Sequence, residues 1–223
     1  MRGKLITIEG IDGSGKGTQS RLIVDRLLEM SIPAKLYSFP SYDSTFFGKE
    51  VGSYLRGEFG TIDSVHPKLS SLLFAGDRFE NKASITQDLD NGTTVVCDRY
   101  VDSNIAHQCA KLPEKERGQF SKWLEELEYG TFGMPRPDMV FLLSIPPETA
   151  REMVLRKSKR SYTDEKEDIH EASWDYLEKV FSIYSETALE RQWNLIDCMR
   201  GDRILGIREI NDLILGMISK QGR

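Results

Sequence analysis

A glycine-rich segment with a single lysine follows the first apolar run of the chain. Residues 5–8 read Leu-Ile-Thr-Ile, and after Glu9 residues 10–18 read Gly-Ile-Asp-Gly-Ser-Gly-Lys-Gly-Thr. Glycine tolerates positive φ and lets the backbone approach a ligand closely, so that successive N–H groups can face a phosphate. Where such a loop leads from a strand into a helix, the helix N-terminus adds to the attraction. The segment therefore predicts a phosphate-binding loop (P-loop) for a nucleotide.

The P-loop residues expected to bind the nucleotide are consecutive in the sequence. They are Gly10, Ile11, Asp12, Gly13, Ser14, Gly15, Lys16, Gly17 and Thr18. Lys16 supplies a point charge close to the phosphates. The strict P-loop pattern has Ser or Thr directly after the lysine, whereas this chain has Gly17 and then Thr18. Adenylate kinases are similar in having this Gly-Lys-Gly-Thr version.

The rest of the chain alternates short apolar runs with longer helical patterns. The predicted strands are residues 5–8, 34–39, 94–97, 139–145 and 194–196. Between them, apolar residues recur at helical spacing, as Ile23, Leu27 and Met30 do. This alternation predicts an α/β fold, a parallel five-stranded sheet with helices on both faces. Because ligands bind beyond the carboxyl ends of such strands, polar residues just after each strand are the candidates.

The composition limits the possible partners. The chain has 30 Lys and Arg against 35 Asp and Glu, a net charge of −5, and so lacks the broad positive potential that binds nucleic acid or anionic membranes. Its three cysteines form no CxxC pair, which argues against a zinc site and is typical of a reducing compartment. No apolar run reaches the length of a signal peptide or a membrane span. We expect a cytoplasmic protein without nucleic-acid or membrane partners.

Asp98 and Arg99 directly follow the predicted strand 94–97. A carboxylate at this place can hold Mg²⁺, directly or through water, and an arginine can donate two hydrogen bonds to one phosphate. The same two residues could instead form an ion pair with a purely structural role at the end of the strand. Their expected place beside the P-loop strand, at the carboxyl edge of the sheet, favours the functional interpretation.

Two further segments gather polar side chains if they are helical. Asn104, His107 and Gln108 would share one helix face, which suits a base edge or a sugar hydroxyl. Phe74 and Arg78 would be i, i+4 neighbours, so that the ring could stack on a pyrimidine while the guanidinium donates to its O4. Thymine has an acceptor at that position and cytosine has an amino donor. Each pattern taken alone also fits a purely structural helix.

A basic segment at residues 156–162 precedes an acidic run at residues 164–168. The segment can be a solvated helix end or a lid over the phosphates. The charge pattern alone favours the solvated helix end, because charge runs are usually solvent faces.

Taken in order, these segments resemble the thymidylate kinase (dTMP kinase) family over about residues 4–188. The family-like motifs are E-G-x-D-G-x-G-K-x-T-Q at residues 9–19, F-P with a tyrosine at 39–42, Y-L-x-G-x-x-G at 54–60, L-F-A-x-D-R at 73–78, D-R-Y-x-x-S-x-x-A at 98–106 and P-x-P-D at 135–138. The combination is far more specific than any one motif.

The resemblance implies a P-loop NTPase of the nucleoside monophosphate kinase fold. It implies a single P-loop kinase domain over residues 1–223, with a short lid near 156–168. The implied reaction transfers the γ-phosphoryl group of ATP to dTMP, giving dTDP and ADP, with Mg²⁺ as cofactor. The family commonly forms homodimers, and a homodimer is expected here.

The resemblance also assigns roles to matching residues. The expected catalytic residues are Lys16, Asp98, Arg99, Arg156 and Arg160. The expected substrate-binding residues are Asp12, Pro40, Tyr42, Phe74, Arg78, Arg99, Ser103, Asn104, His107 and Gln108. The expected metal ligands are Thr18 and Asp98. Some relatives carry an arginine inside the P-loop, but this chain has Gly13-Ser14 there, so its catalytic cations are expected from the lid.

Three positions depart from the family pattern. Besides Gly17, Ser41 stands where many relatives have an arginine that touches the dTMP phosphate. His107 stands where relatives often have an aromatic residue, commonly tyrosine, that helps to exclude a ribose 2′-hydroxyl.

Two alternative functions remain open on the sequence. The first is a kinase for another nucleoside monophosphate such as dUMP, UMP or AMP, against which Phe74, Arg78 and the ordered motifs argue. The second is a P-loop nucleotide-binding protein without kinase activity. Arg99, the basic lid segment and the absence of an N-K-x-D guanine motif argue against it.

Overall fold

The computed structural model describes residues 2–62, 64–158 and 174–220, and all five predicted strands are present. They are β1 (Leu5–Glu9), β2 (Ala34–Ser38), β3 (Thr94–Asp98), β4 (Met139–Ser144) and β5 (Asn194–Asp197). Hydrogen bonds join them in the order β2-β3-β1-β4-β5, and every pair is parallel. The prediction of a parallel five-stranded sheet is confirmed, with the P-loop strand β1 at its centre.

The position of each strand explains its composition. β1 is buried along its whole length, and its Leu5, Ile6 and Ile8 have no exposed surface. A strand that is covered on both faces has no solvent side, and it therefore lacks the alternation of half-buried strands. β2 and β5 lie at the two edges and are only partly buried.

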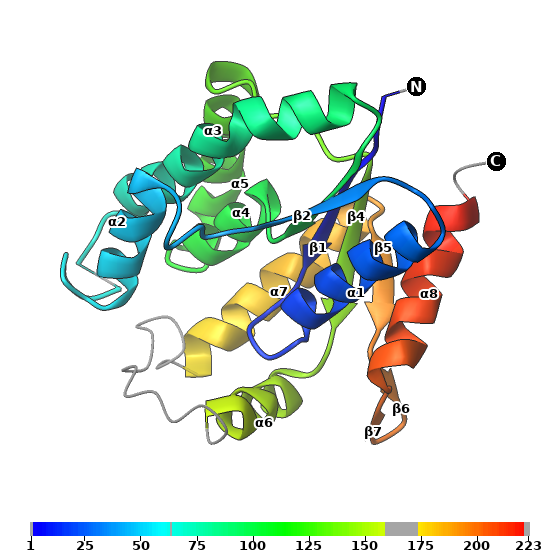
Figure 1. Ribbon diagram of the computed structural model, residues 1–223. Coiled ribbons are helices and arrows are strands. Elements are labelled where there is room, and N and C mark those ends of the chain that lie inside the picture. Colours follow the sequence, from blue (N-terminus) through cyan, green and yellow to red (C-terminus); the bar gives the residue numbers. More distant parts are fainter. Residues whose placement is uncertain (1, 63, 159–173, 221–223) are drawn as a thin grey trace.

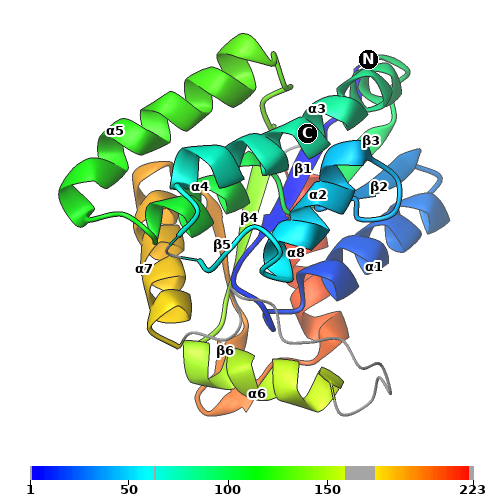
Figure 2. The ribbon, with the colours of Figure 1, turned by 90° about the vertical axis from the view of Figure 1, so that its left-hand side faces the viewer.

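Helices cover both faces of the sheet, as predicted. They are α1 (Lys16–Glu29), α2 (Phe46–Leu55), α3 (Pro67–Asp90), α4 (Val101–Cys109), α5 (Glu114–Glu125), α6 (Pro147–Ser158), α7 (Trp174–Glu190) and α8 (Ile207–Lys220). In Figures 1 and 2, α1 and α8 lie together on one face, and α3, α4 and α7 lie on the other. α5 packs outside against α4, and α2 packs on α3.

Two small elements were not predicted from the sequence. A π-helical segment η1 (Glu126–Thr131) continues α5, and β6 (Met199–Arg200) pairs with β7 (Arg203–Ile204) in an antiparallel hairpin. A π-helical turn is rare and is often found at functional sites. In η1, Glu128 is buried.

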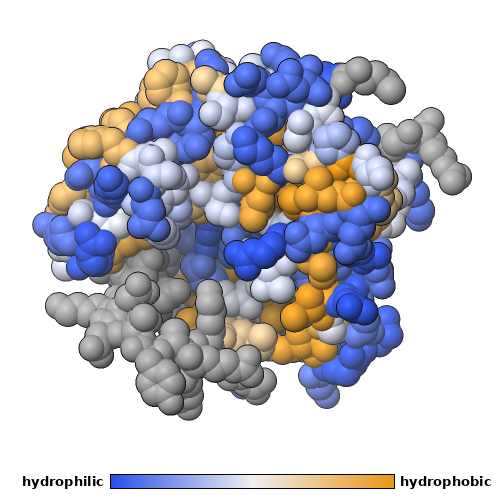
Figure 3. Space-filling model, in the orientation of Figure 1, coloured by the Kyte–Doolittle hydropathy of each residue, from blue (hydrophilic) through white to orange (hydrophobic). Residues whose placement is uncertain are grey.

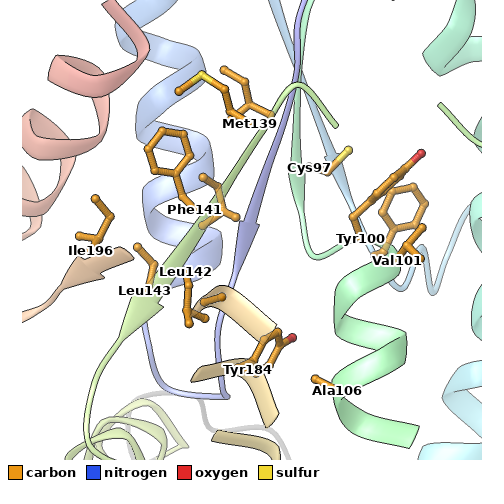
Figure 4. Close-up of a cluster of buried hydrophobic side chains, with 14 of the residues drawn as sticks. Cys97, Tyr100, Val101, Ala106, Met139, Phe141, Leu142, Leu143, Tyr184 and Ile196 are labelled. Carbon is orange, nitrogen blue, oxygen red and sulfur yellow. The ribbon is translucent and has the colours of Figure 1, made fainter. Parts of the chain in front are cut away.

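The hydrophobic core lies between the sheet and its helices. Figure 4 shows Phe141 and Leu143 of β4, Tyr184 of α7 and Ile196 of β5 as parts of one buried cluster. Outside the core, α2 and α3 expose hydrophobic side chains, among them Phe46, Leu69 and Phe79. Hydrophobic colour gathers over these helices at the upper left of Figure 3.

We expect Phe141→Ala to lower the free energy of unfolding by about 3–5 kcal/mol, because it leaves a cavity where the ring was fully buried. The matched control is Leu189→Ala, since Leu189 is 81% exposed and its truncation should change the free energy by no more than about 0.5 kcal/mol. Chemical denaturation of both variants measures the difference. Equal losses in the two variants would show that the Phe141 ring is not buried in the core.

Candidate active site

The P-loop turns as its glycines predict. Gly10, Gly13 and Gly15 have φ values of 144°, 86° and 89°, which side chains other than glycine rarely adopt. A Cβ added at Gly13 would lie 2.1 Å from the carbonyl oxygen of Ala150, so the first turns of α6 pack directly on the loop. Lys16 opens α1, and its Nζ donates to the Ile11 carbonyl at 2.8 Å. The loop is thus shaped to receive an anion at the start of a helix.

Asp98 explains why residue 17 is a glycine. A Cβ added at Gly17 would lie only 2.9 Å from Asp98 Oδ2. The other carboxylate oxygen of Asp98, Oδ1, is buried and has no hydrogen-bond partner among the described residues. Thr18, the other expected metal ligand, is exposed on the first turn of α1. The carboxylate of Asp98 therefore fills the space in which the usual Ser or Thr side chain would begin.

The backbone at Arg99 is held in a left-handed turn. Its φ is 66°, an uncommon value for a residue with a side chain and one that persists only where neighbouring contacts fix it. The Arg99 N–H donates to the Ile8 carbonyl at 3.1 Å. The buried carboxylate of Glu9 accepts from the Tyr100 N–H at 2.8 Å and from the Ser103 hydroxyl at 2.5 Å. These contacts direct the Arg99 side chain toward the P-loop.

The Arg99 guanidinium joins the P-loop to α4. It forms an ion pair with Asp12, and its Nη1 lies 3.3 Å from Ser103 Oγ and 3.3 Å from His107 Nε2. Burial disfavours the charged forms of both partners, but their attraction outweighs it. The pKa of Arg99 is therefore raised, and the pKa of Asp12 is lowered by Arg99 and Lys16. Both groups stay charged at neutral pH.

His107 is neutral in this arrangement. A guanidinium only donates, so His107 Nε2 must accept from Arg99, which leaves the proton on Nδ1. That nitrogen lies 3.2 Å from the Tyr176 hydroxyl, which donates to the His107 carbonyl at 2.9 Å. Burial, and then the Arg99 charge, lower the pKa of His107 to about 3. The imidazole is therefore uncharged near pH 7 and cannot act there as an acid.

Lys16 is buried beside these charges. Burial and the nearby Arg99 lower the pKa of its ammonium to about 8, although Asp12, whose Oδ1 lies 3.8 Å from Nζ, opposes the change. Near pH 7 the lysine is still mostly protonated, and it can pair with an entering phosphate.

A cavity of about 150 Å³ opens next to Arg99. It is lined by all ten predicted substrate-binding residues, together with Phe39 and Leu55. The expected helices are confirmed, because Phe74 and Arg78 lie on α3 while Asn104, His107 and Gln108 lie on α4. The structure thus brings these side chains together, and their contact with substrate stays a prediction.

Arg78, which lines the cavity, belongs to a buried ion pair that the sequence did not reveal. Arg78 is 2% exposed, and its Nε donates to Glu128 Oε2 at 2.9 Å while Nη2 pairs with Oε1. Burial disfavours the charge on Arg78, but Glu128 outweighs it and raises the pKa of the guanidinium. Asn104 Nδ2 also donates to Glu128 Oε1, at 3.1 Å. In the sequence, residues 125–128 read Glu-Glu-Leu-Glu and resemble a solvated helix end.

Of the two catalytic cations expected from the lid, the structure describes the position of only one. Arg156 lies on α6. Arg160, and with it the predicted lid from residue 159 onward, lies outside the described residues.

We expect Gly17→Ser to lower turnover in ATP-dependent phosphoryl transfer by about tenfold or more, because the new side chain displaces the Asp98 carboxylate. The affinity for ATP should change less, since the backbone amides of the P-loop are untouched. Gly118→Ser is the matched control, because a Cβ at Gly118 meets no atom within 4 Å. Steady-state kinetics measure both variants, and wild-type turnover in Gly17→Ser would show that the Asp98 position is unimportant.

Comparison with known proteins agrees with this geometry. The family described as Thymidylate kinase matches residues 8–202. A thymidylate kinase of Schizosaccharomyces pombe is 30% identical over 218 residues, covering 98% of this chain and 92% of the relative. One from Plasmodium falciparum is 32% identical over 199 residues, covering 89% and 84%. The solved structure of a thymidylate kinase from Candida albicans superposes with a TM-score of 0.77 at 26% identity, covering 99% of this chain and 93% of that one.

The family match spans nearly the whole folded chain and includes both the P-loop and the residues around the cavity. The fold, the order of the motifs and the full-length relatives all agree, and this chain belongs to the thymidylate kinase family.

Proposed function

We propose that this thymidylate kinase transfers the γ-phosphoryl group of ATP to dTMP through the residues that surround Arg99. The observation that carries the proposal is the place of the Arg99 guanidinium, which contacts Asp12 of the P-loop and Ser103 and His107 of α4. One cation is thereby shared between the loop for the donor and the cavity for the acceptor. A group at this position can pair with the acceptor phosphate and with charge that develops during transfer.

On the donor side, the P-loop amides and Lys16 would bind the ATP phosphates. Mg²⁺ suits the free carboxylate oxygen of Asp98, which is buried and lacks a hydrogen-bond partner among the described residues. No group of three or more His, Cys, Asp or Glu that could hold a metal occurs in residues 2–62, 64–158 and 174–220. Mg²⁺ is usually held by one or two carboxylates together with phosphate oxygens and water, so a single carboxylate such as Asp98 is sufficient on the side of the protein. Thr18 is the second proposed ligand.

On the acceptor side, Phe74 would stack on thymine. Tyr54 packs edge-on against the Phe74 ring, with 6.2 Å between centroids, and thereby fixes the orientation of that ring. Arg78 would donate to O4 and Asn104 would contact the ring nitrogen. Pro40, Tyr42 and Gln108 also line the cavity, and Pro40 and Tyr42 would lie near the sugar and phosphate of the acceptor.

The chemistry needs charge neutralisation more than proton transfer. The acceptor phosphate is already an oxyanion, so no general base is required. His107 is poorly suited to be one, because its pKa is lowered to about 3 and its Nε2 accepts from Arg99. Lys16, Arg99 and the proposed lid cations Arg156 and Arg160 would offset the repulsion between two anions. Removing one such donor typically costs about 3 kcal/mol in the barrier, roughly a hundredfold in rate. Closure of the lid would also exclude water.

Several broader proposals accompany this mechanism. We propose one kinase domain over residues 1–223, with its lid near 156–168. We propose a homodimer, which the apolar side chains exposed on α2 and α3 support. No helix within the described residues is long and apolar enough to cross a membrane. The three cysteines are buried free thiols, and this supports a reducing cytoplasmic location.

A panel of acceptors tests the proposed function. When dTMP, dUMP, dCMP and AMP are compared with ATP as donor, we expect dTMP to give a higher kcat/KM than dCMP or AMP, because Arg78 would place a donor opposite the O4 that thymine shares with uracil. Coupled detection of ADP measures the rates. A preference for AMP would support a different nucleoside monophosphate kinase, and ATP binding without acceptor-dependent ADP release would support a non-catalytic protein.

The lowered pKa of Lys16 predicts that ATP binding depends on pH. Because that pKa is about 8 in the free protein, the protonated form that pairs with phosphate is lost as the pH rises through 8. The Kd for ATP should then increase, approaching about tenfold per pH unit for one linked proton. Calorimetric titration between pH 7 and roughly pH 9.5 measures the slope.

Lys16→Arg serves as the control for this titration, because a guanidinium keeps its charge throughout the range. The slope should flatten in this variant. A wild-type Kd that does not change with pH would contradict the role of Lys16.

A further inference from the structure

Glu128 lies behind the part of the cavity that Arg78 and Asn104 line. It belongs to the π-helical segment η1, and its side chain is fully buried. Its carboxylate contacts Arg78 of α3 and Asn104 of α4 at once. Glu128 therefore touches both side chains proposed to read the base, although it does not line the cavity itself.

These contacts fix the orientation of the Asn104 amide. Its Nδ2 donates to Glu128 Oε1 at 3.1 Å and to the Ser71 carbonyl at 3.1 Å, which uses both N–H groups. Its Oδ1 is buried and has no hydrogen-bond partner among the described residues. A reversed amide would turn this oxygen against the Glu128 carboxylate and the Ser71 carbonyl, which are both acceptors. Asn104 can therefore present only an acceptor to a ligand in the cavity.

The same carboxylate leaves Arg78 with one free end. Nε and one N–H of Nη2 bind Glu128, so Nη1 and the second N–H of Nη2 remain as donors for the cavity that Arg78 lines. Because Glu128 accepts from two nitrogens of Arg78, the guanidinium plane cannot rotate without breaking a buried, charge-assisted hydrogen bond. This part of the cavity thus offers fixed donors and one fixed acceptor.

We propose that Glu128 is a positioning residue that sets this donor and acceptor pattern and thereby selects bases with an N3–H and an O4, thymine and uracil, against cytosine. The inference rests on the proposed function, because it concerns the base of the acceptor. Thymine places O4 opposite the Arg78 donor and N3–H opposite Asn104 Oδ1. Cytosine would place an amino donor and an unprotonated N3 at these points, and both contacts would be repulsive.

Glu128→Gln tests the proposal with almost no change in shape. A glutamine keeps only one acceptor oxygen, so one of the two contacts to Arg78 is lost, or the acceptor that holds the Asn104 amide is replaced by a donor. The donor and the acceptor offered to the base are then no longer held in one orientation. We expect the ratio of kcat/KM for dTMP to that for dCMP to fall by about tenfold or more, chiefly through KM. The control is Glu126→Gln, the same change at an exposed position of η1, which should leave the ratio unchanged.

A second variant shows whether Glu128 acts through Asn104. In an Asn104→Ala background, Glu128→Gln should change the ratio of kcat/KM for dTMP to that for dCMP by less than it does in the wild-type protein, because only the contribution through Arg78 remains. A merely structural role would lower both activities without changing the ratio. An unchanged ratio in folded Glu128→Gln, or a full effect in the Asn104→Ala background, would overturn the proposal.

The Glu128→Gln variant could fail to fold, because it removes one partner of a buried ion pair. A measurement on the wild-type protein tests the proposal without that variant. In ¹⁵N-labelled protein, the side-chain amide of Asn104 is assigned by its loss in Asn104→Ala. Both of its protons should exchange slowly with solvent, with and without dTMP, because Glu128 and Ser71 hold them. Rapid exchange in the dTMP complex would overturn the inference. Wild-type protein that ignores dTMP would instead refute the proposed function.

Discussion

The buried carboxylate of Glu9 holds together the segments that form the site. It stands at the carboxyl end of β1 and accepts from the Tyr100 N–H, the Ser103 hydroxyl and, at 3.1 Å, the Tyr184 hydroxyl. Burial raises its pKa, and the hydrogen bonds and the Arg99 charge oppose that change. Because these contacts fix the turn after β3 relative to the P-loop strand, the left-handed backbone of Arg99 is maintained.

The charges of the site are arranged before any ligand enters. Asp12 neutralises Arg99 in the free protein, and Lys16 lies close to the same carboxylate. In the proposed mechanism, an acceptor phosphate would take over the contact with Arg99 without a large movement of the protein, because the guanidinium is already anchored by Ser103 and His107. Such preorganisation is how fixed charges lower a barrier with little reorganisation during the reaction.

Local patterns account for what could be predicted of the fold and the cavity. The uninterrupted apolar runs of β1 and β4 indicated interior strands, and helical spacing correctly placed Phe74 beside Arg78 and His107 beside Asn104. The same patterns could not identify what the buried guanidinium of Arg78 contacts. An acidic helix end is usually solvated, and only the packing of η1 behind the cavity makes Glu128 an inward-facing group.

By itself, the sequence determined the P-loop, because its positive φ angles are a local demand that neighbouring glycines satisfy. It also determined the order of strands and helices, through the period of the apolar residues. Only the tertiary structure decided that Asp98 fills the space above Gly17 and that Glu128 meets Arg78. These partners are far apart along the chain, and a contact between distant residues depends on how whole elements pack, which no local pattern records.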